Sequence, residues 1–249
     1  MRLLAIDTAT DLCSAALWID GDVRTRAALA PRAHGELILP MIQALLDEAA
    51  LSLAALDAIA FGRGPGAFTG LRLAAAIAQG LGLAVQVPLI PVSDLRALAA
   101  QALAQGAPGL AAPGQAAPLA PSRALICQDA RMGEVYWACF EATAVEANAA
   151  TLAVVGSEAV AAPQAVVLPQ DWVRTGQPDT GGIVAAGSGF AAYPMLRSKF
   201  AADVSALLPD LYPHAREIAT LAAQDGLGCA VAPEAALPVY LRDRVTAAS

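Results

Sequence analysis

A cluster of polar side chains near the N-terminus could contact a phosphate or the water shell of a magnesium ion. Asp7, Thr8 and Thr10 directly follow the apolar run Leu-Leu-Ala-Ile at 3–6. A carboxylate and two hydroxyls are suitable groups for such contacts, but the same residue types also bond nearby backbone amides in ordinary turns. Taken alone, these residues favour the ordinary turn and leave nucleotide binding as the alternative.

The C-terminal half contains a comparable set. Asp129 ends the apolar segment 124–128 and occupies the place that Asp7 holds in the first half. Gly187-Ser188-Gly189 directly follows another short apolar run, 183–186. In a two-lobed protein such a glycine loop could lie under a nucleotide base, or it could be a plain turn from a strand to a helix. The sequence leaves both interpretations open.

The most glycine-rich loop lies within residues 61–73, which read FGRGPGAFTGLRL. Gly64, Pro65 and Gly66 form the expected turn between a strand and a helix, and Thr69 is the expected N-cap of that helix. The spacing matches neither G-x-G-x-x-G nor G-x-x-x-x-G-K-[ST]. The loop could receive an anion at the helix start or allow two backbone segments to pack closely, and the second interpretation is favoured.

The histidines and cysteines do not form a recognisable metal site. His34 and His214 are the two histidines and are far apart in the sequence. Zinc sites are usually built from closely spaced ligands, and no H-x-x-x-H or C-x-x-C pair is present. We therefore expect no metal, no catalytic residue and four reduced cysteines.

Composition restricts the class of protein. The chain has 249 residues, of which 57% are hydrophobic, and a net charge of −7. Binding of nucleic acid depends mostly on Lys and Arg, so this chain is not expected to bind a polyanion without a partner. The longest apolar stretch, 73–92, is interrupted by glutamines and prolines, and no signal peptide is evident. A cytoplasmic location without membrane insertion is expected.

The order of apolar and polar segments predicts two related α/β lobes. Three strands, a helix, a strand and another helix are expected in the first half, and the pattern of strand, Asp turn and strand recurs at 124–140. Residues 106–121 are rich in Ala, Pro and Gly, which is typical of a linker. The predicted N-terminal lobe is 1–105 and the C-terminal lobe is 122–249, with the option that the helix at 213–228 packs back on the N-terminal lobe.

Two predicted helices have faces suited to another helix. The helix at 34–50 has a wide apolar stripe, and the helix from 69 to about 82 has a face of small residues. Small side chains allow close approach, while larger apolar ones supply buried area. The interface residues predicted on this basis are Leu37, Ile38, Met41, Leu45, Gly70, Leu71, Ala74 and Ala78.

Four sequence blocks resemble the TsaB (YeaZ) family. They occur in the family's order along essentially the whole chain, at 4–10, 64–72, 129–136 and 238–242. The block GPGAFTGLR at 64–72 is the most specific of them. Family members commonly have Ser in place of Ala67, and this difference removes one hydroxyl.

The resemblance implies an actin-like ATPase fold (ASKHA, ribonuclease H-like) with two βββαβα lobes. It also implies a catalytic paralogue, TsaD, whose metal is held by an H-x-x-x-H pair just after its equivalent of Pro91-Val92. Residues 93–97 of this chain read SDLRA and contain no histidine. A metal-dependent transferase or protease activity is therefore not expected of this chain.

By resemblance, the chain is a non-catalytic subunit that forms a heterodimer with TsaD and is joined by TsaE, an ATPase. TsaD transfers threonylcarbamoyl to N6 of adenosine 37 in tRNAs that read codons beginning with A. A homodimer is expected when the chain is alone, tRNA contact only through the complex, and no tightly bound cofactor, with ATP or ADP at the composite complex. The alternative is an ATP-dependent small-molecule kinase of the same superfamily, with Asp7, Thr8 and Asp129 at the phosphates.

Overall fold

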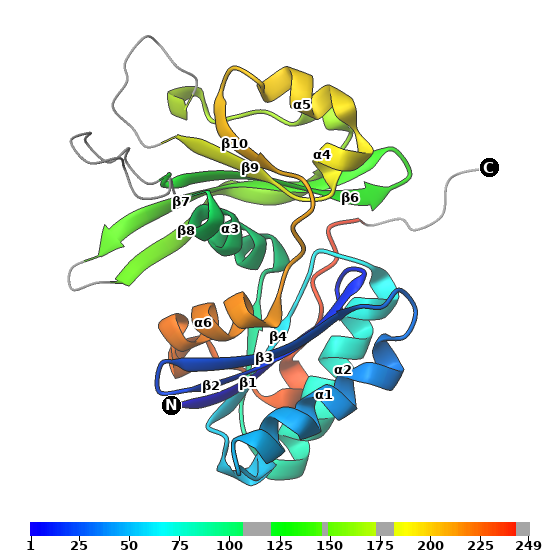
Figure 1. Ribbon diagram of the computed structural model, residues 1–249, viewed down its shortest axis with the longest axis vertical. Helices are drawn as coiled ribbons and strands as arrows, with labels where there is room; N and C mark the ends of the chain where they lie inside the picture. The colour runs from blue at the N-terminus through cyan, green and yellow to red at the C-terminus, as the bar shows by residue number, and fades with distance from the viewer. Residues whose placement is uncertain (107–120, 146–148, 173–181, 243–249) are drawn as a thin grey trace. The chain divides into compact units, whose positions relative to one another are not determined.

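A computed structural model describes residues 1–106, 121–145, 149–172 and 182–242 (Figure 1). The chain divides into two compact units. Unit 1 comprises Met1–Ala97 and Tyr212–Tyr240, and unit 2 comprises Leu98–Leu211 and Leu241–Ser249. Most of the linker expected at 106–121 lies outside the described residues. The sequence-based division ended the first lobe at 105, whereas the structure divides the chain within helix α3 (Asp94–Gln105).

Unit 1 is built on a five-stranded sheet with the order β3-β2-β1-β4-β5. β1, β2 and β3 form an antiparallel meander, and β4 and β5 continue the sheet parallel to β1. β1 is buried on both faces, because helices cover both sides of the sheet (Figure 1). The strands are β1 (Arg2–Asp7), β2 (Leu12–Ile19), β3 (Asp22–Leu29), β4 (Ala58–Gly62) and β5 (Leu89–Val92).

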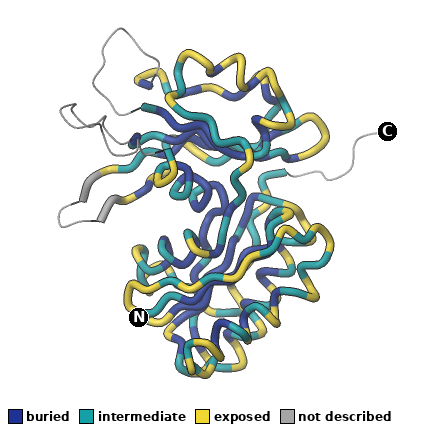
Figure 2. The backbone as a smooth tube through the Cα atoms, viewed as in Figure 1, coloured by how far each residue is buried: buried dark blue, intermediate teal, exposed yellow. Residues whose placement is uncertain are grey.

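Three helices pack on this sheet. α1 (His34–Glu48) and α2 (Phe68–Val85) bury their apolar faces together with Leu4, Ile6 and Phe61 in one hydrophobic core. α6 (Ala215–Asp225) returns from the far end of the chain and contacts β1 and β2. Alternate residues of β1 point to opposite faces of the sheet, so the strand supplies side chains to both helical layers. Figure 2 shows these central strands as buried and the helices as buried on one side only.

The N-terminal contact of α6 depends on a buried hydroxyl. The side chain of Ser14, on β2, is fully buried, and its Oγ accepts a hydrogen bond of 3.0 Å from the N–H of Ala215. Helix-start amides have no partner within the helix, so this bond satisfies a donor that water cannot reach. The Ser14 hydroxyl therefore joins β2 to α6 across 201 positions of sequence.

We expect Ser14→Ala to lower the free energy of unfolding by about 1 to 3 kcal/mol, because it leaves the buried Ala215 amide unpaired. Urea denaturation followed by circular dichroism measures the change. Thr220→Ala is the matched control, since the Thr220 hydroxyl bonds only to the Arg216 carbonyl on the exposed side of α6. Equal effects of the two substitutions would contradict the assigned role of Ser14.

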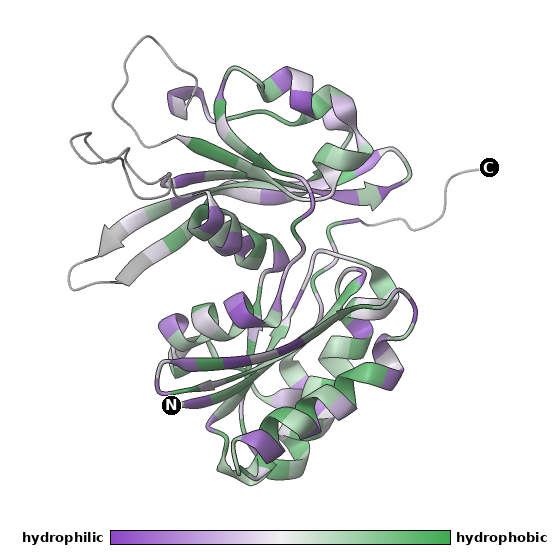
Figure 3. Ribbon diagram, viewed as in Figure 1, coloured by the Kyte–Doolittle hydropathy of each residue, from purple (hydrophilic) through white to green (hydrophobic). Residues whose placement is uncertain are grey.

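α2 has the length and composition of a membrane span. It is the one helix in the described part of the chain that passes this test, with a mean hydropathy of 1.4 over 18 residues, of which 28% are buried inside the protein. Its buried side contains Ala74, Ala75 and Ala78, which belong to the core of unit 1. Figure 3 shows the apolar character of α1 and α2. An apolar helix in the core of an α/β unit meets the same criterion, but the exposed remainder of α2 still needs an explanation.

Unit 2 has a second five-stranded sheet, with the order β10-β9-β6-β7-β8. β6, β7 and β8 are antiparallel, and β9 and β10 continue the sheet in parallel. The helices α4 (Gly189–Ala192) and α5 (Pro194–Phe200) contribute Phe190, Leu196 and Phe200 to its core. The strands are β6 (Arg123–Arg131), β7 (Glu134–Val145), β8 (Ala149–Ala161), β9 (Ile183–Ala186) and β10 (Val204–Leu208).

The two sheets share one plan, three antiparallel strands followed by two parallel ones. This agreement confirms the duplicated α/β fold expected from the sequence. The units differ between their third and fourth strands. Unit 1 has α1 there, whereas the described residues of unit 2 have two short 3-10 helices, Pro163–Ala165 and Gln170–Trp172.

Several element boundaries differ from the sequence-based expectations. Thr69 is not an N-cap, because α2 begins at Phe68 and its N-cap position is Ala67, which makes no side-chain capping bond. The strand expected at 85–92 is shorter, since α2 continues to Val85 and ends at Gln86 in the left-handed conformation. β8 was not predicted, because its Ala-rich sequence does not alternate clearly between apolar and polar residues.

Candidate partner interface and polar turns

The polar side chains of the first turn bond to their own unit. Asp7 ends β1 and is fully buried, and its Oδ1 accepts a 2.7 Å hydrogen bond from the N–H of Ala9. The Thr8 hydroxyl donates to the Gly70 carbonyl at 2.7 Å, and Thr10 Oγ1 accepts from the N–H of Leu12 at 3.3 Å. The Asp7 and Thr10 bonds are the local turn chemistry that the residues alone favoured, whereas the Thr8 bond reaches a residue 62 positions away. All three side chains are thus bonded within unit 1.

Asp7 has a partner that the sequence analysis did not identify. Asp94, the first residue of α3, is also fully buried, and its carboxyl group is close enough to that of Asp7 for each to shift the pKa of the other. Burial raises the pKa of Asp7 to about 7, against the opposing effects of its hydrogen bonds. Burial and the neighbouring Asp7 also raise the pKa of Asp94 well above its ordinary value. Desolvation disfavours the ionised form of each group, so the pair keeps protons that exposed carboxyls would lose.

The glycine loop before α2 is packed against backbone on two sides. A Cβ on Gly66 would lie 2.6 Å from the Ala9 carbonyl oxygen, and one on Gly64 would lie 2.7 Å from the Val239 carbonyl oxygen. The N–H of Ala67 donates to Ala9 O at 2.7 Å. Pro65 is buried between these glycines. The geometry therefore corresponds to close backbone packing and not to an open anion cradle.

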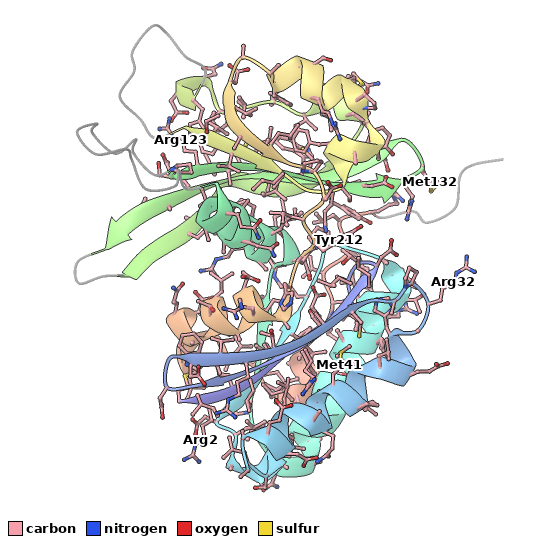
Figure 4. The ribbon with its side chains drawn as sticks, viewed as in Figure 1. Arg2, Arg32, Met41, Arg123, Met132 and Tyr212 are labelled. Carbon is pink, nitrogen blue, oxygen red and sulfur yellow. The ribbon has the colours of Figure 1, made fainter. Side chains whose placement is uncertain are left out.

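The polar turn of unit 2 is also internally bonded. Asp129 Oδ1 accepts hydrogen bonds from the N–H of Arg131 at 2.9 Å and from the Tyr193 hydroxyl at 3.0 Å. Ser188 Oγ accepts a 3.1 Å bond from the N–H of Asp129. Met132, labelled in Figure 4, is exposed in the two-residue turn that connects β6 to β7.

Gly187 and Gly189 flank this serine and lie against β6. A Cβ on Gly187 would overlap the carbonyl oxygen of Cys127, and one on Gly189 would lie 2.8 Å from the same atom. Gly187 also has a φ of 109°, which L side chains rarely adopt. These glycines thus allow a strand-to-helix turn to pack on a neighbouring strand.

Most of the predicted interface residues are core residues of unit 1, which corrects the sequence-based assignment. At most 1% of each of five of these side chains is exposed, so they have no surface to offer a partner. Leu37 and Met41 are partly buried and pack against the same core. A Cβ on Gly70 would overlap the Thr8 carbonyl oxygen, so this glycine serves internal packing. The five buried residues are Ile38, Leu45, Leu71, Ala74 and Ala78.

A different face of α2 is available to a partner. At 100° per residue, five exposed residues of α2 lie within one narrow stripe opposite its buried side. We call this stripe the outer face of α2. On α1, Leu39 is 50% exposed, and on α2, Leu83 is 58% exposed. The outer face of α2 consists of Thr69, Arg72, Ala76, Gly80 and Leu83.

Gly80 is the informative member of this stripe. A glycine in a helix interior costs about 1 kcal/mol relative to alanine. The position where a Cβ would be has no atom within 4 Å, so nothing in the described chain requires glycine there. An exposed glycine beside Ala76 and Leu83 leaves room for the backbone of another helix to approach. The sequence could not identify this face, because α2 is apolar or small on nearly all sides.

The C-terminal segment packs against the first residues of α2. The guanidinium of Arg72 lies 3.8 Å from the centre of the Phe68 ring, and its Nε donates to the Tyr240 hydroxyl at 3.2 Å. The rings of Phe68 and Tyr240 are 5.2 Å apart. Val239 N–H donates to Arg63 O at 2.7 Å, which fixes the segment beside the glycine loop. Val239 and Tyr240 of the block at 238–242 thus meet the segment 63–72 in unit 1.

Comparison with known proteins finds a matching family model and several similar proteins. The family model described as TsaD, tRNA N6-adenosine threonylcarbamoyltransferase, matches residues 27–246. The tRNA threonylcarbamoyladenosine biosynthesis protein TsaB of Escherichia coli K12 is 40% identical over 98% of this chain and 96% of its own length. TsaB of Haemophilus influenzae is 42% identical over 55% of this chain and 52% of its own length.

A solved structure gives the same relationship. YeaZ from Pseudomonas aeruginosa superimposes with a TM-score of 0.79 and is 40% identical, over 96% of this chain and 99% of that one. The aligned lengths include both units, so the relationship is not limited to one lobe. Since a named relative and a solved structure each match almost the whole chain at 40% identity, the protein belongs to the TsaB (YeaZ) family.

Proposed function

We propose that this protein is a non-catalytic accessory subunit of tRNA threonylcarbamoyladenosine biosynthesis. It pairs with the transferase TsaD, and TsaE joins the pair as an ATPase. Together they attach threonylcarbamoyl to N6 of adenosine 37 in tRNAs that read codons beginning with A. Family membership supports the pathway, and the exposed Gly80 on the outer face of α2 is the structural observation that most supports the pairing role.

The outer face of α2 has the properties that a helix-pair contact requires. Gly80 and Ala76 allow close approach, and Leu83 supplies apolar surface. Burial of such surface contributes about 25 cal/mol per Å². The same face can pair with a second copy when TsaD is absent, which supports a homodimer of the isolated protein. The net charge of −7 supports contact with tRNA through the partner.

The contacts of the two histidines support a role without catalysis. Nε2 of His34 lies 2.8 Å from the carbonyl oxygen of Thr10. Nδ1 of His214 accepts the N–H of Arg216 and so caps α6. Within the described ranges, no group of three His, Cys, Asp or Glu side chains could hold a metal ion. In this proposal the imidazoles stabilise turns and helix ends.

Reconstitution of tRNA modification tests the proposal. TsaD, TsaE, unmodified tRNA and the threonylcarbamoyl donor are combined with or without this protein, and the modified nucleoside is measured by mass spectrometry. We expect modification only when both TsaD and this protein are present. Full modification without this protein, or with this protein in the absence of TsaD, would contradict the proposal.

The alternative function is an ATP-dependent kinase of the same superfamily. We expect isothermal titration of the isolated protein with Mg-ATP to show weak or no binding, because Asp7 and Thr8 are already bonded inside unit 1. Any ATP or ADP would then belong to the composite complex. Micromolar affinity accompanied by turnover would instead favour the kinase.

A further inference from the structure

The two buried carboxyl groups of unit 1 lie where three chain segments meet. Asp7 is at the end of β1 and Asp94 is at the start of α3. Asp7 Oδ1 accepts the N–H of Ala9, and Asp94 Oδ2 accepts the N–H of Gly64. The other two oxygens, Asp7 Oδ2 and Asp94 Oδ1, are buried and have no donor from any other described group. Each of these two interacting carboxyl groups therefore has one buried oxygen without a partner.

A hydrogen bond between two carboxyl groups requires a proton on one of them. Two ionised carboxylates in a fully buried site would repel each other and lose hydration without compensation. The other ionisable groups that act on the pair are the Arg63 guanidinium, which lowers the pKa of Asp94, and the Cys13 thiol, whose own pKa Asp7 raises. Neither group is a hydrogen-bond partner of Asp7 Oδ2 or Asp94 Oδ1. A proton on one carboxyl group would supply the donor that these two oxygens lack.

The pair holds the start of α2 from two sides. On one side, Asp94 bonds twice to Gly64, since its N–H also donates to the Gly64 carbonyl at 3.0 Å. On the other side, Asp7 fixes the N–H of Ala9, whose carbonyl accepts the N–H of Ala67 at 2.7 Å. Gly64 and Ala67 both belong to the segment 62–67 that precedes α2. Anything that separates the two carboxyl groups therefore acts directly on this loop.

We propose that a proton shared between Asp7 and Asp94 is a structural component of unit 1, and that its loss at high pH releases the loop 62–67 and the first turn of α2. The inference concerns the isolated protein and does not depend on the proposed partnership. In this inference, protonation of the pair controls local opening of the segment that precedes the outer face of α2.

The sign of the pH dependence follows from the raised pKa values. The unfolded carboxyl groups ionise near pH 4, whereas that of Asp7 ionises at about 7 in the folded protein. The folded state therefore holds protons that the unfolded state has released. The stabilisation of the folded state by the shared proton is fully present below pH 4 and is lost as the pH rises through about 7 and above. Each such proton changes the opening equilibrium by up to about tenfold per pH unit.

Hydrogen exchange of the full chain, read by mass spectrometry and corrected for intrinsic rates, tests this inference. Between pH 6 and pH 9, we expect opening of the segment 62–72 to increase at least tenfold in the wild-type protein. In Asp7→Asn the increase should fall below threefold, because the amide N–H₂ donates permanently to Asp94 while its oxygen accepts from Ala9. Asp57→Asn is the matched control, since Asp57 accepts the N–H of Arg2 at the other end of β1.

The control should retain the wild-type response to pH. Equal pH dependence in the wild type and in Asp7→Asn would overturn the inference. Asp94→Asn offers the same replacement from the other side, and failure of both variants to fold at pH 6 would also overturn it, because a neutral amide should suffice there.

Discussion

Gly80→Leu is expected to weaken binding to TsaD at least tenfold while the isolated protein becomes no less stable. The added side chain would occupy the open space on the outer face of α2, where a partner helix would approach. Overpacking a close contact costs about 1 to 3 kcal/mol, and 1.4 kcal/mol corresponds to a factor of ten in affinity. Leucine is also a better helix former than glycine by nearly 1 kcal/mol. Stability and binding should therefore change in opposite directions.

Titration calorimetry with TsaD and thermal unfolding of the isolated protein measure these two changes. Gly35→Leu is the matched control, because Gly35 is likewise exposed on a helix and has an empty Cβ position, but it lies on α1. The control should bind TsaD normally. If Gly80→Leu binds as tightly as the wild type, the outer face of α2 is not the contact surface. Sedimentation of the same variants would show whether self-association uses the same face.

Gly70→Ala is expected to destabilise the protein by about 3 kcal/mol or more, or to prevent folding of unit 1. Its Cβ would overlap the Thr8 carbonyl oxygen, which is backbone and cannot rotate away. The hydrogen bond from the Thr8 hydroxyl to the Gly70 carbonyl would be displaced as well. Forced overpacking and a lost buried bond are among the mechanisms behind large mutational effects.

Gly80→Ala provides a stringent control, because it is the same substitution in the same helix. There the new methyl group meets nothing, so the gain in helix propensity should raise the stability by up to about 1 kcal/mol. Chemical denaturation of both variants measures the difference. Changes of opposite sign in the free energy of unfolding would confirm that Gly70 serves internal packing and Gly80 does not. A Gly70→Ala variant as stable as the wild type would refute the packing role.

The sequence by itself determined the family, the duplicated α/β plan and the packing loop before α2. These features depend on local order, since apolar runs, polar turns and glycines follow one another within a few residues. The turn role of Asp7, Thr8 and Thr10 was the favoured interpretation for the same reason. The hydrogen bonds that Ala9 donates to Asp7 and Leu12 donates to Thr10 span two positions, whereas the bond from Thr8 to Gly70 spans 62 and could not be predicted locally.

Only the tertiary structure decided which face of α2 is buried, because Ala, Gly and Leu occur on all its sides and give no clear direction. It also decided that Asp7 pairs with Asp94 and that α6 returns to unit 1. These contacts join segments far apart in the sequence, and the Ser14 bond to Ala215 spans 201 positions. No local pattern encodes such a pairing, since it exists only after β1 has been enclosed by helices on both faces.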